Sequence, residues 1–107
     1  MSSRVQCKPA QPRAGEVVEV RIIIGHPMES GQRRNDQGER IRRNLINKLR
    51  CAYDGAVVFD ADIGTGIAAN PLFVFWMRAT RSGDLRFDWV DDDGVTGAAT
   101  YALTVVG

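Results

Sequence analysis

Apolar and polar residues alternate along several short segments of the chain. In residues 17–24 every even position is Val or Ile, whereas Glu19 and Arg21 occupy odd positions. The same two-residue period recurs in residues 45–53, 85–89 and 100–105. Successive side chains of a β-strand point to opposite faces, so this period is typical of strands that bury one face.

Two further segments refine this pattern. The second alternating segment predicts a strand that buries Leu45 and Cys51 and turns Ile46 to the opposite face. It ends at Asp54-Gly55, a dipeptide that favours a tight hairpin because both residues tolerate a positive φ. Residues 72–77 are apolar on both faces, which predicts a central strand of a sandwich.

Strand-like segments follow one another with Gly, Asp or Pro between them, and no sustained helical period interrupts them. This spacing predicts an all-β fold, an immunoglobulin-like antiparallel β-sandwich of about seven strands. The chain lacks the Cys…Trp…Cys order of antibody domains, because neither Trp lies between Cys7 and Cys51. With 107 residues and no linker, we expect a single domain over residues 1–107.

The segment His26-Pro27-Met28-Glu29-Ser30-Gly31 marks the point where the chain leaves this framework. Proline lacks a backbone N–H and fixes φ, so Pro27 ends the preceding strand. Residues 32–38 are polar and carry no apolar period. Long loops of this kind in small domains are often functional, and we expect contacts with other molecules here. For His26 a second interpretation is a corner residue that caps backbone groups.

Charge is unevenly distributed although the net charge is only +1. Residues 1–50 hold eleven Lys or Arg against five acids, and residues 51–107 hold three against eight. The basic stretch between Arg33 and Arg50 could steer an acidic partner or an anion. It contains no aromatic residue for base stacking, which argues against nucleic acid. No segment reaches the roughly 20 apolar residues of a membrane span.

Few residues are available for catalysis or metal binding. His26 is the only histidine, so neither a catalytic triad nor a multi-histidine metal site is expected, and we expect no enzyme, cofactor or metal. Residues 91–94 are interpreted as a turn because they lack the alternating ligands of a calcium loop. Cys51 is expected to be buried, whereas Cys7 is expected to be half-exposed or to pair with Cys51.

An ordered set of short motifs resembles one known family, the Z subunit of the SoxYZ sulfur-carrier complex of bacterial thiosulfate oxidation. The motifs are His26-Pro27-Met28-Glu29-Ser30-Gly31, Arg33-Arg34, Gly38, Ala69-Asn70-Pro71-Leu72-Phe73 and Asp93-Gly94-Val95-Thr96-Gly97. The resemblance spans about Val5 to Val105. One departure is Arg42, where the family commonly has Pro after the preceding Ile.

The resemblance implies a non-catalytic subunit that binds a Y subunit as a heterodimer. In this family the Y subunit holds sulfur intermediates on the cysteine of a C-terminal Gly-Gly-Cys-Gly-Gly arm. The present chain ends in Val105-Val106-Gly107, so we expect it to be the partner of the carrying subunit. Transient contacts with other Sox enzymes, and self-association of the isolated chain, are also expected.

Localisation and site residues follow from the same resemblance. The N-terminal residues include no secretory signal, which taken alone predicts the cytoplasm. The family is instead exported to the periplasm with its partner, and we expect that here. The residues expected to bind the partner are His26, Pro27, Met28, Glu29, Arg33, Arg34, Asn70, Phe73 and Trp76.

Two alternatives stay open at this point. The chain could be a free-standing immunoglobulin-like module that recognises a protein or an anion through its basic loop. It could also be a thiol carrier or redox protein that uses Cys7, which would require a lowered pKa of that thiol.

Overall fold

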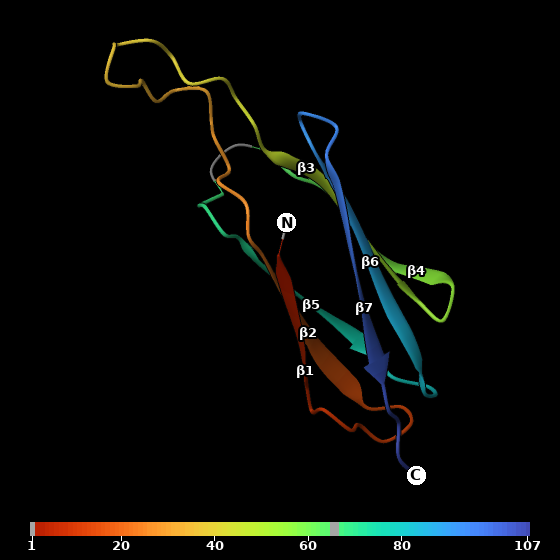
Figure 1. Cartoon of the computed structure of the whole chain (residues 1–107). Helices are drawn as coiled ribbons and strands as arrows, with labels where there is room; N and C mark the ends of the chain where they lie inside the picture. Colours follow the sequence, from red (N-terminus) through yellow and green to blue (C-terminus); the bar gives the residue numbers. More distant parts are fainter. Residues whose placement is uncertain (1, 65–66) are drawn as a thin grey trace.

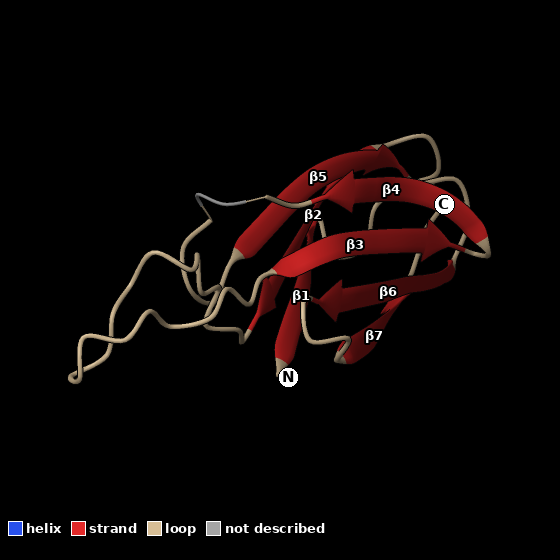
Figure 2. Cartoon of the chain, turned by 90° about the horizontal axis from the view of Figure 1, so that it is seen from above, coloured by secondary structure: helices blue, strands red, loops and turns tan. Residues whose placement is uncertain are grey.

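Two antiparallel sheets pack face to face in the computed structural model, which describes residues 2–64 and 67–107 (Figures 1 and 2). One sheet has the strand order β1-β2-β5 and the other β4-β3-β6-β7. The strands are β1 (Ser3–Lys8), β2 (Val17–Ile24), β3 (Ile46–Tyr53), β4 (Ala56–Asp62), β5 (Leu72–Arg78), β6 (Gly83–Asp91) and β7 (Thr96–Leu103). The described residues include no helix that could cross a membrane. The all-β, seven-strand prediction is confirmed.

The core lies between the sheets and is formed by the apolar faces that the two-residue period predicted. The four even positions of β2 are fully buried, as are Leu85 and Phe87 of β6. The rings of Phe59 and Phe75 stack across the two sheets with centroids 4.6 Å apart. Each fully buried Val, Ile, Leu or Phe side chain stabilises the folded state by about 1.5–3 kcal/mol, because its apolar surface is removed from water.

Two details of the sequence-based strand assignment are wrong. Strand β5 is an edge strand, which pairs with β2 alone among the described residues, and Trp76 on its outer face is 64% exposed. An apolar run cannot distinguish a doubly buried strand from an edge strand with an apolar outer face. Ile46 is buried with Leu45, because the β3–β6 register shifts between Ile46 and Lys48.

The Asp54-Gly55 turn has the predicted geometry. Both residues have a positive φ, 49° for Asp54 and 87° for Gly55, as a two-residue hairpin of type I′ requires. The turn joins β3 to β4 and so fixes which residues of the two strands face each other.

Residues 25–45 form an extended loop with two facing sides, hereafter the arm, which projects from one end of the sandwich (Figure 1). Its two sides are joined by isolated bridges, between Glu29 and Asn44 and between Arg34 and Arg40. The arm helps to make the molecule 60 Å long against 21 and 19 Å in the other directions. The expected charged loop is therefore an extended projection whose base lies against the sandwich.

Candidate functional site

His26 anchors the base of the arm from within the protein. Its side chain is only 3% exposed. The Met28 N–H donates to His26 Nδ1 at 3.0 Å, so the ring proton is on Nε2, which lies 3.2 Å from Asp91 Oδ2. This geometry agrees with the interpretation of His26 as a corner residue that caps a backbone group. The expected contact of His26 with a partner stays a prediction, and its burial leaves little of the ring to touch one.

Asp91, the first residue of the predicted turn 91–94, is the buried partner of His26, a contact that the sequence did not predict. Its Oδ1 accepts the N–H groups of Asp93 at 3.0 Å and Val95 at 2.9 Å. Burial acts to raise the pKa of Asp91, but the hydrogen bonds from Val95, His26 and Asp93 outweigh it, and the pKa is lowered. The last residue of β6 therefore holds both its own turn and the arm.

Asp92 fastens the other side of the arm. It accepts the Leu45 N–H and the Arg43 guanidinium at Oδ2, each at 3.0 Å, and Asn47 at Oδ1 at 3.0 Å. The bond from Asn47 is the main cause that lowers the pKa of Asp92. Next to it, Asp93 pairs with Arg42. Residues 91–94 form the predicted turn, and its three carboxylates hold both ends of the arm.

A groove of about 820 Å³ lies between the arm base and the segment 67–69. It brings together four of the residues expected to bind a partner, and these are Pro27, Met28, Glu29 and Arg33. Arg33 holds Glu29 in a two-point contact, with Nε to Oε2 at 3.0 Å and Nη2 to Oε1 at 2.6 Å. The walls are mostly small or apolar, and one fixed ion pair lies at the rim.

Asn70 connects this groove to β5. Its N–H donates to the His26 carbonyl at 2.7 Å and its Oδ1 accepts the His26 N–H at 3.2 Å. Its φ is +50°, a conformation that Asn tolerates better than most residues. Asn70 therefore clasps the backbone at the start of the arm.

The remaining predicted contact residues are dispersed. Arg34 lies farther out on the arm and donates to the Gly38 carbonyl. Phe73 points inward and packs on the core, whereas Trp76 is on the outer face of the same strand. The structure thus separates an arm-base groove from an exposed apolar face, and the sequence did not predict the part that residues 67–69 play in the groove.

Most of the basic stretch is already matched by carboxylates. Ion pairs within the described residues join Arg33 to Glu29, Arg42 to Asp93, Arg43 to Asp92, Lys48 to Asp62 and Arg50 to Asp60. These exposed pairs add little stability, but they neutralise the surface. The stretch is therefore a weaker anion attractor than its composition suggests.

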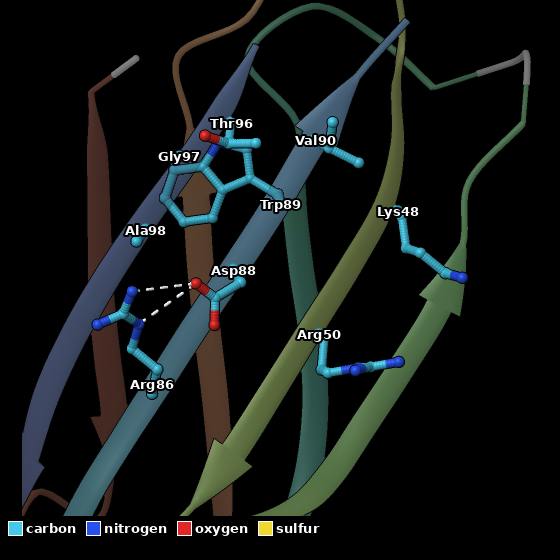
Figure 3. A pocket seen from close by; sticks show the side chains of 9 residues that line it. All are labelled: Lys48, Arg50, Arg86, Asp88, Trp89, Val90, Thr96, Gly97 and Ala98. Carbon is cyan, nitrogen blue, oxygen red and sulfur yellow. Dashed lines mark hydrogen bonds and ion pairs between the residues drawn. The ribbon is translucent and has the colours of Figure 1, made fainter. Parts of the chain in front are cut away.

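A second hollow, of about 620 Å³, lies over β3, β6 and β7 (Figure 3). Its cations are also paired, Arg86 with Asp88 as the figure shows. The Trp89 indole lies against Gly97, where a Cβ would approach its ring atoms to 2.3 Å. Only Gly at position 97 leaves room for this packing.

The two cysteines are free and buried. Burial raises the pKa of the Cys7 thiol to about 11 and that of Cys51 to about 12. The expected burial of Cys51 is confirmed, whereas Cys7 is neither half-exposed nor paired. Neither thiol has the lowered pKa that a carrier or redox cysteine requires. Within residues 2–64 and 67–107, no three His, Cys, Asp or Glu side chains gather into a metal-binding group.

Comparison with known proteins gives a family and a fold. A family model described as "Sulphur oxidation protein SoxZ" matches residues 5–102. No curated protein sequence matches.

Several solved structures share the fold. A superoxide reductase (neelaredoxin) from Ignicoccus hospitalis matches with a TM-score of 0.72 and 18% identity, over 99% of this chain and 81% of that one. A putative superoxide reductase from Thermotoga maritima matches with a TM-score of 0.72 and 13% identity, over 98% and 86%. The sulfur carrier protein SoxY from Chlorobium limicola f thiosulfatophilum matches with a TM-score of 0.66 and 13% identity, over 100% and 76%. At these identities the likeness shows the fold alone, and it confirms the immunoglobulin-like prediction.

Proposed function

The chain belongs to the SoxZ family of the Sox sulfur-oxidation system, and we propose that it is the non-catalytic subunit that binds a Y-type subunit. In this proposal the Y-type subunit carries the covalent sulfur intermediates on its cysteine arm. The observation that carries the proposal is the family match over nearly the whole chain. The fold likeness to a sulfur carrier protein, SoxY, is consistent with it.

The chemistry of the described cysteines favours a role as the partner-binding subunit over a role as the subunit that carries covalent sulfur. A carrier cysteine must be accessible and partly ionised to accept sulfur. Cys7 and Cys51 are buried, with pKa values raised to about 11 and about 12. The proposal therefore assigns the covalent chemistry to the partner.

The arm-base groove is the proposed contact for the C-terminal Gly-Gly-Cys-Gly-Gly segment of the Y-type subunit. It is open, has mostly small or apolar walls and contains Pro27 and Met28. A narrow extended segment with little side-chain bulk fits such a groove, and the Glu29–Arg33 pair offers a donor and an acceptor at its rim. His26, Asp91 and Asp92 hold the walls in place.

The periplasm is the proposed location, with export in complex with the partner. This part of the proposal rests on family membership. It is tested by cell fractionation with and without the gene for the Y-type subunit, because co-export requires that the chain stays in the cytoplasm when the partner is deleted.

Purification of the tagged chain from its native organism grown on thiosulfate tests the proposed function. We expect a stoichiometric partner with a C-terminal Gly-Gly-Cys-Gly-Gly sequence, and intact-mass analysis should find added sulfur on part of it. Recovery of a lone, unmodified chain would contradict the proposal and favour a free-standing binding module.

Two arginine variants test the groove within the same experiment. Arg33→Glu places two acids together at the groove rim, and we expect less partner to be retained or less of it to carry sulfur. Arg86→Glu is the matched control, because it reverses an exposed, ion-paired arginine on β6, outside the groove. Equal effects of the two variants would contradict the proposal that the groove contacts the partner.

A further inference from the structure

The outer face of the β1-β2-β5 sheet carries several exposed apolar side chains. Directly paired residues of neighbouring strands share a face, and the register aligns Ile23 with Leu72 and Glu19 with Trp76. The outward apolar side chains are Val17, Ile23, Leu72, Val74 and Trp76. Four of them are among the exposed large hydrophobic residues of the protein. Contiguous apolar patches of this kind commonly mark protein interfaces.

The free edge of β5 adjoins this surface and is unprotected. Apart from Arg78 at its end, β5 contains no charge and no proline, and it pairs with β2 without a bulge. Natural proteins usually protect exposed edges with charges, prolines or bulges. An unprotected edge next to an apolar face indicates that another chain covers both.

The charges around this surface indicate what kind of chain that is. Four cations lie on the same outer face, Arg4 and Lys8 of β1, Arg21 of β2 and Arg78 of β5, against the single acid Glu19. Glu19 pairs with Arg21 at 2.8 Å. Arg4, Lys8 and Arg78 have no ion-pair partner among the described residues. The face is therefore apolar along β5 and at Ile23 and Val17, basic along β1, and carries the Arg21–Glu19 pair on the strand between them.

This charge pattern favours an acidic partner over a second copy of the chain. Two copies that meet through this face would bring an excess of cations against an equal excess, and like-charge juxtaposition at an interface costs several kcal/mol. A surface with an apolar strip beside acidic residues would match both the apolar and the basic side of this face.

A small hollow within the face adds a specific recognition point. It has a volume of about 100 Å³ and is lined by Arg4, Gln6, Arg21, Ile23 and Leu72. Two guanidinium groups beside two aliphatic side chains suit a Glu or Asp side chain, since arginine pairs with carboxylates in a two-point geometry.

The face continues towards the arm base. A neighbouring shallow hollow also includes Arg4 and Ile23 and extends to Gly25 and Asn70, and Asn70 follows the groove segment 67–69 directly. A standard interface needs about 800 Å² per partner. A three-stranded face is only about 15 Å wide at a strand spacing of about 4.8 Å, so a stable partner would use this continuation.

We infer that the outer face of the β1-β2-β5 sheet and the edge of β5 bind the body of the Y-type subunit through a surface that sets acidic residues beside an apolar strip. Trp76 is the apolar anchor and Arg4 and Arg21 hold a partner carboxylate. The inference rests on the proposed function and specifies the surface that such a subunit would use.

The test measures the affinity of the purified chain for the Y-type subunit of the same organism by calorimetry. We expect Trp76→Ala to weaken binding at least about tenfold, as truncation of a buried aromatic anchor does. Its matched control is Val57→Ala, which truncates an exposed apolar side chain on the other sheet and should leave binding unchanged.

Charge reversal tests the basic side of the face independently. We expect the double variant Arg4→Glu, Lys8→Glu to weaken binding about tenfold at low salt and to reduce its salt dependence. The double variant Arg50→Glu, Arg86→Glu makes the same change of net charge on the other sheet and should not. Melting curves establish that each variant is folded.

The outcomes separate the inference from the proposed function. Wild-type affinity in both Trp76→Ala and Arg4→Glu, Lys8→Glu would overturn the inference and leave the subunit role intact. Absence of binding by the unaltered chain would contradict the proposed function itself. A tight homodimer that Trp76→Ala dissociates and that the Y-type subunit does not displace would show that a second copy occupies the face and would overturn the inference.

Discussion

His26 Nε2 and Asp91 Oδ2 lie 3.2 Å apart in the interior, although 65 positions separate the two residues in the chain. This contact joins the start of the arm to the end of β6. Because Nδ1 of the same ring accepts the Met28 N–H, His26 can bond Asp91 only as a donor through Nε2. The pair therefore sets how the groove side of the arm sits on the sandwich.

Asp91→Asn should destabilise the protein by about 1–3 kcal/mol, the cost of a buried polar group without a partner. The amide can keep the two backbone N–H groups on its oxygen, but its NH₂ group then faces the donor Nε2 of His26. Denaturant unfolding measures the loss. The control Asp93→Asn removes only an exposed ion pair with Arg42 and should cost under about 1 kcal/mol. An equal loss in both variants would contradict the role given to the buried pair.

Acid should remove stability through the two turn carboxylates. The pKa values of Asp91 and Asp92 are lowered in the fold, so the native state binds fewer protons than the unfolded chain at mildly acidic pH. Their contribution is complete above the unfolded pKa of about 4 and disappears as the pH falls through the lower folded values. Unfolding free energies from pH 7 to pH 2 should show this fall, and Asp91→Asn should show a shallower one. An unchanged slope in that variant would contradict the lowered pKa of Asp91.

The buried thiols should be unreactive in the native protein. Cys7 and Cys51 have pKa values raised to about 11 and about 12 from an ordinary 9.0, so iodoacetamide at pH 8 should label neither until denaturant is added. Because the folded state retains these protons, stability is complete below pH 9 and declines as the pH rises towards the folded values. Fast labelling of native Cys7 would revive the thiol-carrier alternative.

Gly97→Ala should cost about 1–3 kcal/mol, the range for overpacking a filled site. The added Cβ would lie 2.3 Å from Trp89 ring atoms, so the indole must move, and near-ultraviolet circular dichroism should report the change. Gly64→Ala is the matched control, because a Cβ there meets no atom within 4 Å. A wild-type spectrum and wild-type stability for Gly97→Ala would contradict the packing described here.

The sequence by itself determined the strands and most of their inward faces. Val18 to Ile24 alternate because a strand exposes successive residues to opposite sides, and a buried face tolerates only apolar residues there. The Asp54-Gly55 turn was equally predictable, since its positive φ values are a local property of two residues. The family was identified from several short motifs that occur in the same order along the chain.

Only the tertiary structure decided how the surfaces are used. Trp76 and Phe73 belong to one apolar run, yet the packing of only one face of β5 against the other sheet leaves Trp76 exposed and Phe73 packed on the core. His26 was expected either to contact a partner or to cap backbone groups at a corner, and its buried contact with Asp91 depends on a residue that chain folding brings from the end of β6. Local pattern records which face of an element avoids water, whereas the partner of a buried polar group and the covering of an apolar face depend on elements distant in sequence.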